Sequence, residues 1–488
     1  MLSYFQDHLW QLLLALNYAL VIIFSILIVL KNRNPVKTLT YLFALATLPF
    51  LGLLVYYFFG QDYRKDKIFA KKYFLDDQKL RDWRARFRLD REERKDFREK
   101  YGDGIYKIYR LLRENEKAVL TFDNKVQILN NGDEKFKRLK ADLRQASHHI
   151  HLEYFAVNDD PCVREIFEIL CEKARDGVDV CLIYDDVGSR LLSETRQRLD
   201  QNGVLHYAFM PVLYPRFTSK FNYRDHRKIV VIDGHIGYVG GINLNAKYDN
   251  SRDHGHRYWR DTHLRIEGEA VGSLQASFLL SWDFVAEGNF KLLDSHFPRT
   301  RVSTTDIVAV QIAASGPDTD WPNIMEAIFT AINTAREYIF ITTPYLIPNE
   351  AILTALCTAG RSGVDVRIII PYESDSWAAQ YASDSYIEQL ISSKVRIYRY
   401  RKGFIHSKTM VIDDIFVSIG TANLDYRSFS FNFEINALLY DYGKAEEMRA
   451  IYLEDLKDCN EVDKERWLER GLRRKLQESF NRLWAPLL

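Results

Sequence analysis

A pattern of histidine, lysine and aspartate occurs twice in this chain of 488 residues. Each copy has the spacing H-x-K-x-x-x-x-D, and the six residues are His226, Lys228, Asp233, His406, Lys408 and Asp413. The copies are 180 positions apart, and Asn243 recurs as Asn423 at the same offset. A single H-x-K is common on surface strands, but four side chains at one constant offset indicate a duplicated domain.

The spacing within each copy predicts which side chains point the same way. Alternate residues of a strand lie on one face, so the histidine and lysine of each copy should project together. The aspartate, seven positions after the histidine, has the opposite parity. Within the catalytic motif we therefore expect Asp233 and Asp413 to brace the strand and its turn rather than to contact substrate.

Two histidines, two lysines and two asparagines that converge in one pocket would handle a phosphodiester. One imidazole can attack phosphorus and form a covalent intermediate. The other can protonate the departing alkoxide and then deprotonate the next acceptor. The lysines, with Asn243 and Asn423, would stabilise the charge on the nonbridging oxygens. We expect such a site to need no metal ion, no cofactor and no ATP.

A nucleophilic histidine needs an acceptor that orients its second ring nitrogen. Glu434 lies 11 residues after Asn423, and Asp261 occupies the corresponding place in the first copy. These two carboxylates are the predicted orienting groups. The first copy carries seven extra residues around 250–256, which we interpret as a loop near the site entrance.

A second histidine-rich segment contains His148, His149 and His151. The sequence places nothing acidic or sulfur-bearing at a spacing that would complete a metal site, so we interpret them as polar positions near a strand edge. The five cysteines form no C-x-x-C pair, which disfavours a zinc ribbon or a disulfide framework.

Helical and β-branched segments alternate in each copy, which predicts an α/β fold with helices on both faces of a sheet. Residues 229–232 and 367–370 have the pattern of strands, and 163–174 and 349–361 that of helices. The predicted segments are a membrane region at 1–60, a charged juxtamembrane linker at 61–119, a first domain at 120–285, a connector at 286–305 and a second domain at 306–488.

Two apolar runs precede the repeats. Leu9–Leu30 has 22 uncharged residues and Leu39–Phe59 has 21, so each spans about 30 Å as a helix. Nothing basic precedes the first run and the second follows at once, which favours a transmembrane hairpin over a cleaved signal peptide. Basic residues lie both in the loop and after the second run, so charge gives only a preference for a cytoplasmic catalytic region.

Two other segments have amphipathic helical patterns. In the linker, Leu80, Trp83 and Phe87 share one face, and this pattern fits either an interfacial helix on anionic headgroups or a solvated helix with ion pairs. The second stripe, which we expect to pack on the second domain rather than on a membrane surface, comprises Leu472, Leu476, Phe480 and Leu483.

The order of these parts resembles that of the bacterial cardiolipin synthases, a branch of the phospholipase D superfamily, over nearly the whole chain. Besides the two motifs, the segments that carry the resemblance are 150–154 (IHLEY), 259–262 (WRDT), 343–345 (TPY) and 420–428 (GTANLDYRS). The resemblance implies two phospholipase D-like domains that form a pseudo-twofold pair. Segment 371–375 (PYESD) departs from the family, which often has a small residue and a lysine there.

The resemblance also implies a reaction in a bacterial inner membrane. His226 would attack the phosphorus of phosphatidylglycerol and release glycerol, with His406 as the acid. A second phosphatidylglycerol would then lose a proton to His406 and displace the enzyme, giving cardiolipin. The sequence does not determine the oligomeric state.

Four alternatives remain. A hydrolase that uses water as the acceptor, and a transferase to another alcohol such as one that makes phosphatidylserine, would share every catalytic residue. A nuclease is disfavoured by the apolar hairpin and by a net charge of +1, which lacks the basic excess typical of nucleic-acid enzymes. A membrane scaffold would not need two complete motifs. Aromatic residues make up 14% of the chain, which suits a protein that handles apolar surfaces.

Overall fold

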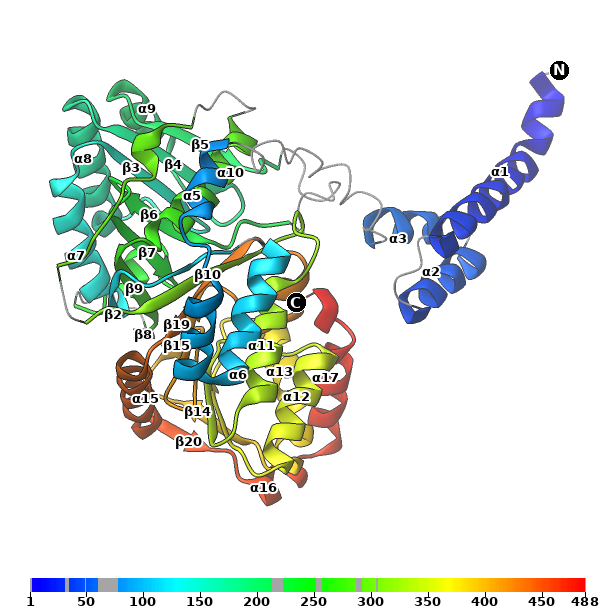
Figure 1. The fold of residues 1–488 in the computed structure, drawn as a ribbon. Coiled ribbons are helices and arrows are strands. Elements are labelled where there is room, and N and C mark those ends of the chain that lie inside the picture. The colour runs from blue at the N-terminus through cyan, green and yellow to red at the C-terminus, as the bar shows by residue number, and fades with distance from the viewer. Residues whose placement is uncertain are drawn as a thin grey trace. The chain divides into compact units, whose positions relative to one another are not determined.

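The computed structural model describes residues 2–30, 35–48, 50–59, 78–116, 118–212, 223–251, 257–286, 292–303 and 306–487. By its internal contacts the chain divides into two units. One contains the N-terminal helices and the other contains both repeats (Figure 1). Most of the predicted entrance loop, and the basic residues just after the second apolar run, lie outside the described residues.

The described part of the N-terminal unit contains three helices. They are α1 (Leu2–Leu30), α2 (Pro35–Thr47) and α3 (Leu51–Phe59). Within α1, His8–Leu30 is the one described helix that is long and apolar enough to cross a membrane. The first predicted span is therefore present as a continuous helix, which is consistent with membrane association.

The second predicted span is interrupted near its middle. α2 ends at Thr47 and α3 begins at Leu51, and Phe50 between them has a φ of 62°. The sequence has a proline at position 49, and proline has no N–H and disfavours the helical conformation in the residue before it, so the sequence favours an interruption here. The Phe50 N–H donates instead to Oδ1 of Asn17 in α1 at 3.0 Å. The second predicted span is therefore present as two short helices, and the predicted hairpin is shown only in part.

The second unit contains two large mixed sheets with matching strand order. The first runs β2-β9-β7-β6-β3-β4-β5, and the second runs β1-β10-β19-β17-β16-β11-β13-β14-β20. Removing the edge strands β1 and β20 leaves the same order in both, which confirms the duplication. The strands of the first sheet are β2 (Asn124–Asn130), β3 (His149–Tyr154), β4 (Asp179–Asp185), β5 (Leu205–Phe209), β6 (Lys228–Ile232), β7 (Ile236–Gly240) and β9 (Thr262–Gly268).

The second sheet repeats this arrangement with one added strand at each edge. Its strands are β1 (Leu120–Thr121), β10 (Ala309–Ser315), β11 (Tyr338–Thr342), β13 (Asp365–Pro371), β14 (Arg396–Tyr400), β16 (Thr409–Ile412), β17 (Phe416–Gly420), β19 (Glu434–Tyr440) and β20 (Cys459–Glu461). We call each large sheet with its helices a lobe. β1 precedes the first sheet in sequence but pairs with β10, so the chain contributes a strand to the second lobe before it forms the first.

Helices cover both faces of each sheet, and a shared core joins the faces that the two sheets turn toward each other. In the first lobe the helices are α7 (Asn131–Gln145), α8 (Pro161–Arg175), α9 (Ser193–Gln201) and α10 (Val271–Val285). In the second they are α11 (Asn323–Thr334), α12 (Glu350–Arg361), α13 (Trp377–Ser392) and α15 (Tyr442–Lys457). One apolar cluster contains Ile229 and Val231 from the first sheet and Ile312 and Ile435 from the second. The two lobes therefore pack through their sheets.

The charged segment before the repeats belongs to this body. α5 (Gln78–Ala85) buries Leu80 and Trp83, and the Trp83 ring lies 5.2 Å from that of Phe297. α6 (Arg91–Glu116) packs against α11 and contributes Ile108 and Leu112 to the apolar core of the second lobe. Leu80 and Trp83 face protein, so neither the interfacial nor the solvated interpretation of this stripe holds.

Candidate active site

The two histidines stand just before equivalent strands of the two sheets. His226 precedes β6, and His406 follows the short strand β15 (Phe404–Ile405) and precedes β16. Both are largely buried, with 12% and 10% of their side-chain surfaces exposed. The neighbouring lysines bind back onto this backbone: Lys228 Nζ donates to the His226 carbonyl at 2.6 Å, and Lys408 donates to the His406 carbonyl.

Each histidine is paired with a carboxylate from the other repeat. Nδ1 of His226 lies 2.9 Å from Oε1 of Glu434 and 3.0 Å from Oε2. Nδ1 of His406 lies 2.8 Å from Oδ2 of Asp261. Both predicted carboxylates thus contact a histidine ring, and each contacts the histidine of the other copy rather than that of its own. With Nδ1 engaged, Nε2 of each ring is the nitrogen left for substrate.

Backbone hydrogen bonds between the lobes fix this exchange. The His226 N–H donates to the Phe433 carbonyl at 2.9 Å, one residue before Glu434. The His406 N–H donates to the Arg260 carbonyl at 2.7 Å, one residue before Asp261. Strand β8 (Trp259–Arg260) also pairs with β15 in parallel. In each case, the residue that accepts the hydrogen bond from the histidine N–H is followed directly by the carboxylate that orients the histidine ring.

The two motif aspartates brace turns at the other end of the strands. Asp233 accepts hydrogen bonds from the backbone N–H groups of Ser147, His148 and His149 at 2.8–2.9 Å. Asp413 accepts from Arg336, Glu337 and Tyr338 at 2.7–2.9 Å. These carboxylates tie the start of β3 to the end of β6, and the start of β11 to the end of β16. The contacts match a bracing role.

The two asparagines bond to neighbouring protein groups. Asn243 accepts from the Ala156 N–H at 3.1 Å and donates Nδ2 to the Tyr248 hydroxyl at 3.0 Å. Asn423 donates Nδ2 to Oδ2 of Asp425 at 3.0 Å. Both side chains are buried and hold the loops after β7 and β17. A direct contact with phosphate remains a prediction for both.

Burial controls the charge states of the site. It lowers the pKa of Lys228 to about 7 and that of Lys408 to about 8. It lowers the pKa of His226, with Glu434 acting in the opposite direction, and that of His406 further below the usual value. It raises the pKa of Asp261 to about 6. The imidazoles are therefore neutral near pH 7, as a nucleophile requires.

Sequence reasoning missed the aromatic surroundings of the histidines. The Tyr248 hydroxyl lies 3.4 Å from Nδ1 of His406, and Lys408 Nζ lies 2.8 Å from the same nitrogen. The Trp259 ring lies 5.5 Å from the His406 ring. Position 248 corresponds to Ser428 in the second copy, whose hydroxyl accepts from the Asn423 N–H at 3.1 Å. This difference at the constant offset was the available signal that the two histidines have unequal environments.

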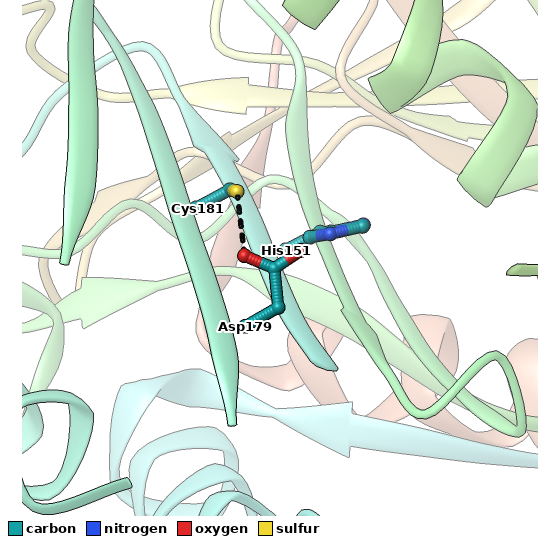
Figure 2. Close-up of side chains that lie close together, drawn as sticks. All are labelled: His151, Asp179 and Cys181. Carbon is teal, nitrogen blue, oxygen red and sulfur yellow. Dashed lines mark hydrogen bonds between the residues drawn. The ribbon is translucent and has the colours of Figure 1, made fainter. Parts of the chain in front are cut away.

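The histidine-rich segment lies on a central strand, not at a strand edge, because β3 runs between β6 and β4. Figure 2 shows His151 beside Asp179 and Cys181, whose ligand atoms lie within 4.8 Å of one another. Cys181 Sγ donates to Asp179 at 3.6 Å, and His151 contacts Gln275. The expected place near a strand edge was therefore wrong, and the acidic and sulfur-bearing neighbours of His151 come from the adjacent strand, where spacing along the sequence does not indicate them. These contacts form no part of the histidine pair described above.

Comparison with known proteins gives consistent matches. A family model described as "Cardiolipin synthase, PLD-like domain" matches residues 139–254 and 328–456. One described as "Phospholipase_D-nuclease N-terminal" matches residues 19–61.

Three curated proteins are similar over almost their whole length. Cardiolipin synthase 2 of Bacillus anthracis is 41% identical over 94% of this chain and 88% of that protein. The cardiolipin synthase of Halalkalibacterium halodurans is 40% identical over 96% and 92%. The probable cardiolipin synthase YwiE of Bacillus subtilis is 38% identical over 97% and 93%.

Among solved structures, the phosphatidylserine synthase of Haemophilus influenzae has a similar fold. It aligns with a TM-score of 0.59 and 16% identity, over 78% of this chain and 100% of that one. At this identity the likeness concerns the fold, and it matches the two-lobed architecture described above.

Proposed function

Because the chain belongs to the cardiolipin synthase family of phospholipase D-like proteins, we propose that it joins two molecules of phosphatidylglycerol into cardiolipin and releases glycerol. The observation that carries this proposal is the pair of histidines, each oriented through Nδ1 by a carboxylate of the other repeat. Such a pair can perform two successive displacements at one phosphorus.

In the first displacement, Nε2 of His226 attacks the phosphorus of phosphatidylglycerol. The bond from phosphorus to the glycerol oxygen breaks, and His406 gives a proton to that oxygen. The diacylglycerol phosphate stays bound to His226, and Glu434 stabilises the positive charge that forms on the ring. Lys228 and Lys408 stabilise the negative charge on the nonbridging oxygens.

In the second displacement, a glycerol hydroxyl of another phosphatidylglycerol gives its proton to His406. Its oxygen attacks phosphorus and the bond to His226 breaks, so the number of phosphodiester bonds is unchanged and no energy source is consumed. Assignment of the nucleophile to His226 is supported by its simpler surroundings, because Nδ1 of His406 is also approached by Lys408 and Tyr248.

The arriving phosphate explains how His406 acts as an acid although burial keeps its pKa low. A phosphodiester carries one negative charge, and a nearby opposite charge favours the protonated forms of histidine and lysine. Substrate binding would therefore charge the site that burial leaves nearly neutral. The proton would be taken up with the substrate and transferred to the leaving glycerol.

We further propose that α1 and the α2–α3 segment lie in a bacterial cell membrane with the catalytic lobes on the cytoplasmic side. The hydropathy of His8–Leu30 and the match of residues 19–61 to an N-terminal family model support the membrane location. Protection of the full-length protein from added protease in sealed cells, and its digestion in opened cells, would test the side.

The experiment for the reaction uses full-length protein reconstituted with phosphatidylglycerol as the only lipid and with a chelator present. Mass spectrometry should find cardiolipin and glycerol in equal amounts, and neither should form with His226→Ala or His406→Ala. His235→Ala, an exposed histidine, is the matched control and should keep full activity. Phosphatidic acid in place of cardiolipin would identify water as the acceptor and reject the proposal.

A further inference from the structure

The C-terminal helix α17 (Leu472–Arg482) has two faces of opposite character. Residues three or four positions apart share a face of a helix. Arg474, Glu478 and Asn481 lie on one face, and the last two are buried. The other face is exposed, and together with the next two residues it is here called the α17 stripe. The exposed fractions are 73% for Leu472, 61% for Leu476 and 57% for Phe480 in the helix, and 75% for Leu483 and 49% for Trp484 just after it.

Ion pairs hold the polar face of α17 against the catalytic body. Arg474 Nη2 lies 3.0 Å from Oδ2 of Asp384 in α13. Arg470, just before the helix, lies 2.9 Å from Glu388 in α13 and 2.9 Å from Glu478. Asp384 and Glu478 are buried, so rotating the helix would take Arg474 away from a buried carboxylate, Asp384.

The orientation of α17 overturns the sequence-based expectation that the stripe packs on the second domain. The polar face does so, and the apolar face points outward. The periodicity of a stripe does not distinguish a face that packs on protein from one that contacts another apolar medium. An exposed apolar patch of this extent marks a surface that binds something.

Charge indicates what the stripe binds. Arg473, Lys475 and Arg482 belong to the same helix and lie beside the stripe. Two copies packed stripe to stripe would bring these like charges together, whereas the surface of an anionic bilayer attracts them. Large apolar residues on one face with basic residues at its borders is the composition of helices that lie in the membrane interface.

The end of α17 is connected to the catalytic motif. After the stripe, the short helix η5 (Ala485–Leu487) packs against α14 (Tyr426–Ser430), which follows Asn423 in the chain. Ala485 is buried in the core of the second lobe. A membrane that receives the stripe would therefore also fix the orientation of the second motif relative to the lipid surface.

We propose that the α17 stripe inserts into the interface of an anionic membrane and docks the catalytic lobes on the surface from which they draw lipid. The identity of that lipid as phosphatidylglycerol rests on the proposed function, but insertion requires no turnover. A membrane span such as α1 tethers the chain without orienting the lobes. The stripe supplies that orientation.

The first experiment measures insertion directly. Full-length protein with Cys459→Ser, which removes the one described cysteine that is not buried, carries a nitroxide at Leu476→Cys. A label at Glu454→Cys, on the exposed surface of α15, is the matched control. In vesicles that contain phosphatidylglycerol, the Leu476 label should be accessible to oxygen and shielded from a water-soluble nickel complex, and the control label should show the reverse.

Each other result of this experiment contradicts the proposal. Access of nickel to the Leu476 label would show that the stripe faces water. Spin–spin broadening between labels would show that a second copy covers it. Shielding of the Leu476 label from nickel should weaken in vesicles of phosphatidylcholine alone, because the basic residues beside the stripe then have no anionic headgroups to bind. Equal protection in both vesicles would reject the role of anionic lipid.

The second experiment separates docking from catalysis. Leu476→Ser/Leu483→Ser should lower the ratio of activity on vesicles to activity on detergent-dispersed lipid by about tenfold or more, since each apolar side chain contributes to binding through its buried area. Leu453→Ser, an exposed leucine on α15, should leave this ratio unchanged. An unchanged ratio in the double variant would contradict docking. If no variant and no wild-type protein made cardiolipin, the proposed function would fail while the labels would still decide insertion.

Discussion

Nδ1 of His226 lies 2.9 Å from a carboxylate oxygen of Glu434, a residue 208 positions later in the chain. The reciprocal contact joins His406 to Asp261, 145 positions earlier. Neither repeat therefore contains a complete half of the site. The duplication supplies two similar lobes, and the exchange of carboxylates between them makes one site from two.

The first prediction concerns these orienting carboxylates. Glu434→Gln keeps the size of the side chain and a hydrogen-bond acceptor but removes the charge that stabilises a positive ring on His226. We expect the rate of cardiolipin formation to fall by about 10²–10⁴-fold, the usual contribution of a positioned acid–base group. Asp261→Asn should act similarly through His406. Turnover would be measured on vesicles, and the exposed Glu454→Gln should be unaffected.

These two variants should also differ from each other. Loss of Glu434 should slow formation of the covalent intermediate, whereas loss of Asp261 should slow both proton transfers. A substrate with a leaving group that needs no proton should therefore rescue the first step in Asp261→Asn but not in Glu434→Gln. Equal rescue of both would contradict the assigned roles.

The second prediction concerns pH. The charge on Lys228 is lost as pH rises through its pKa of about 7, and that on Lys408 through about 8, so binding of an anionic phosphodiester should weaken over this range. Asp261 loses its charge as pH falls through about 6 and then no longer supports a charged His406. We expect kcat/KM to be greatest between about 6 and 7. A profile that rises steadily to pH 9 would contradict this.

The third prediction separates bracing from catalysis. Asp413→Ala removes the acceptor of three backbone N–H groups and should lower the free energy of unfolding by about 1.5–3 kcal/mol. Asp413→Asn should cost less, because asparagine still accepts and tolerates the φ of 51° at this position. Thermal unfolding in detergent would measure both. Full stability with lost activity would instead indicate a direct role in the reaction.

The sequence allowed much of the site to be predicted, because the constant offset identified both motifs and the alignment of the segments after them identified both carboxylates. It did not show which carboxylate serves which histidine. Alternation predicts which side chains share a face of one strand, but the pairing of His226 with Glu434 depends on contacts between two lobes. The position of His151 beside Cys181 was missed for the same reason, since these residues meet only across β3 and β4.

The fold, like the site, was predicted only in part. The alternation of helices and strands predicted the α/β class, and the duplication predicted two related sheets. The break between α2 and α3 and the outward face of α17 were not predicted. In both segments the apolar pattern was correct, but hydropathy does not report backbone conformation or the identity of the medium that an apolar face contacts.

The measurement that tests the mechanism most directly is capture of the covalent intermediate. Full-length His406→Asn would be mixed with a phosphatidyl ester of p-nitrophenol, which leaves without a proton, and quenched before the acceptor reacts. Peptide mass spectrometry should then find the phosphatidyl group on His226, and His226→Asn should carry none. A phosphatidyl group on another residue, or release of nitrophenol without any covalent adduct, would contradict a double displacement through His226.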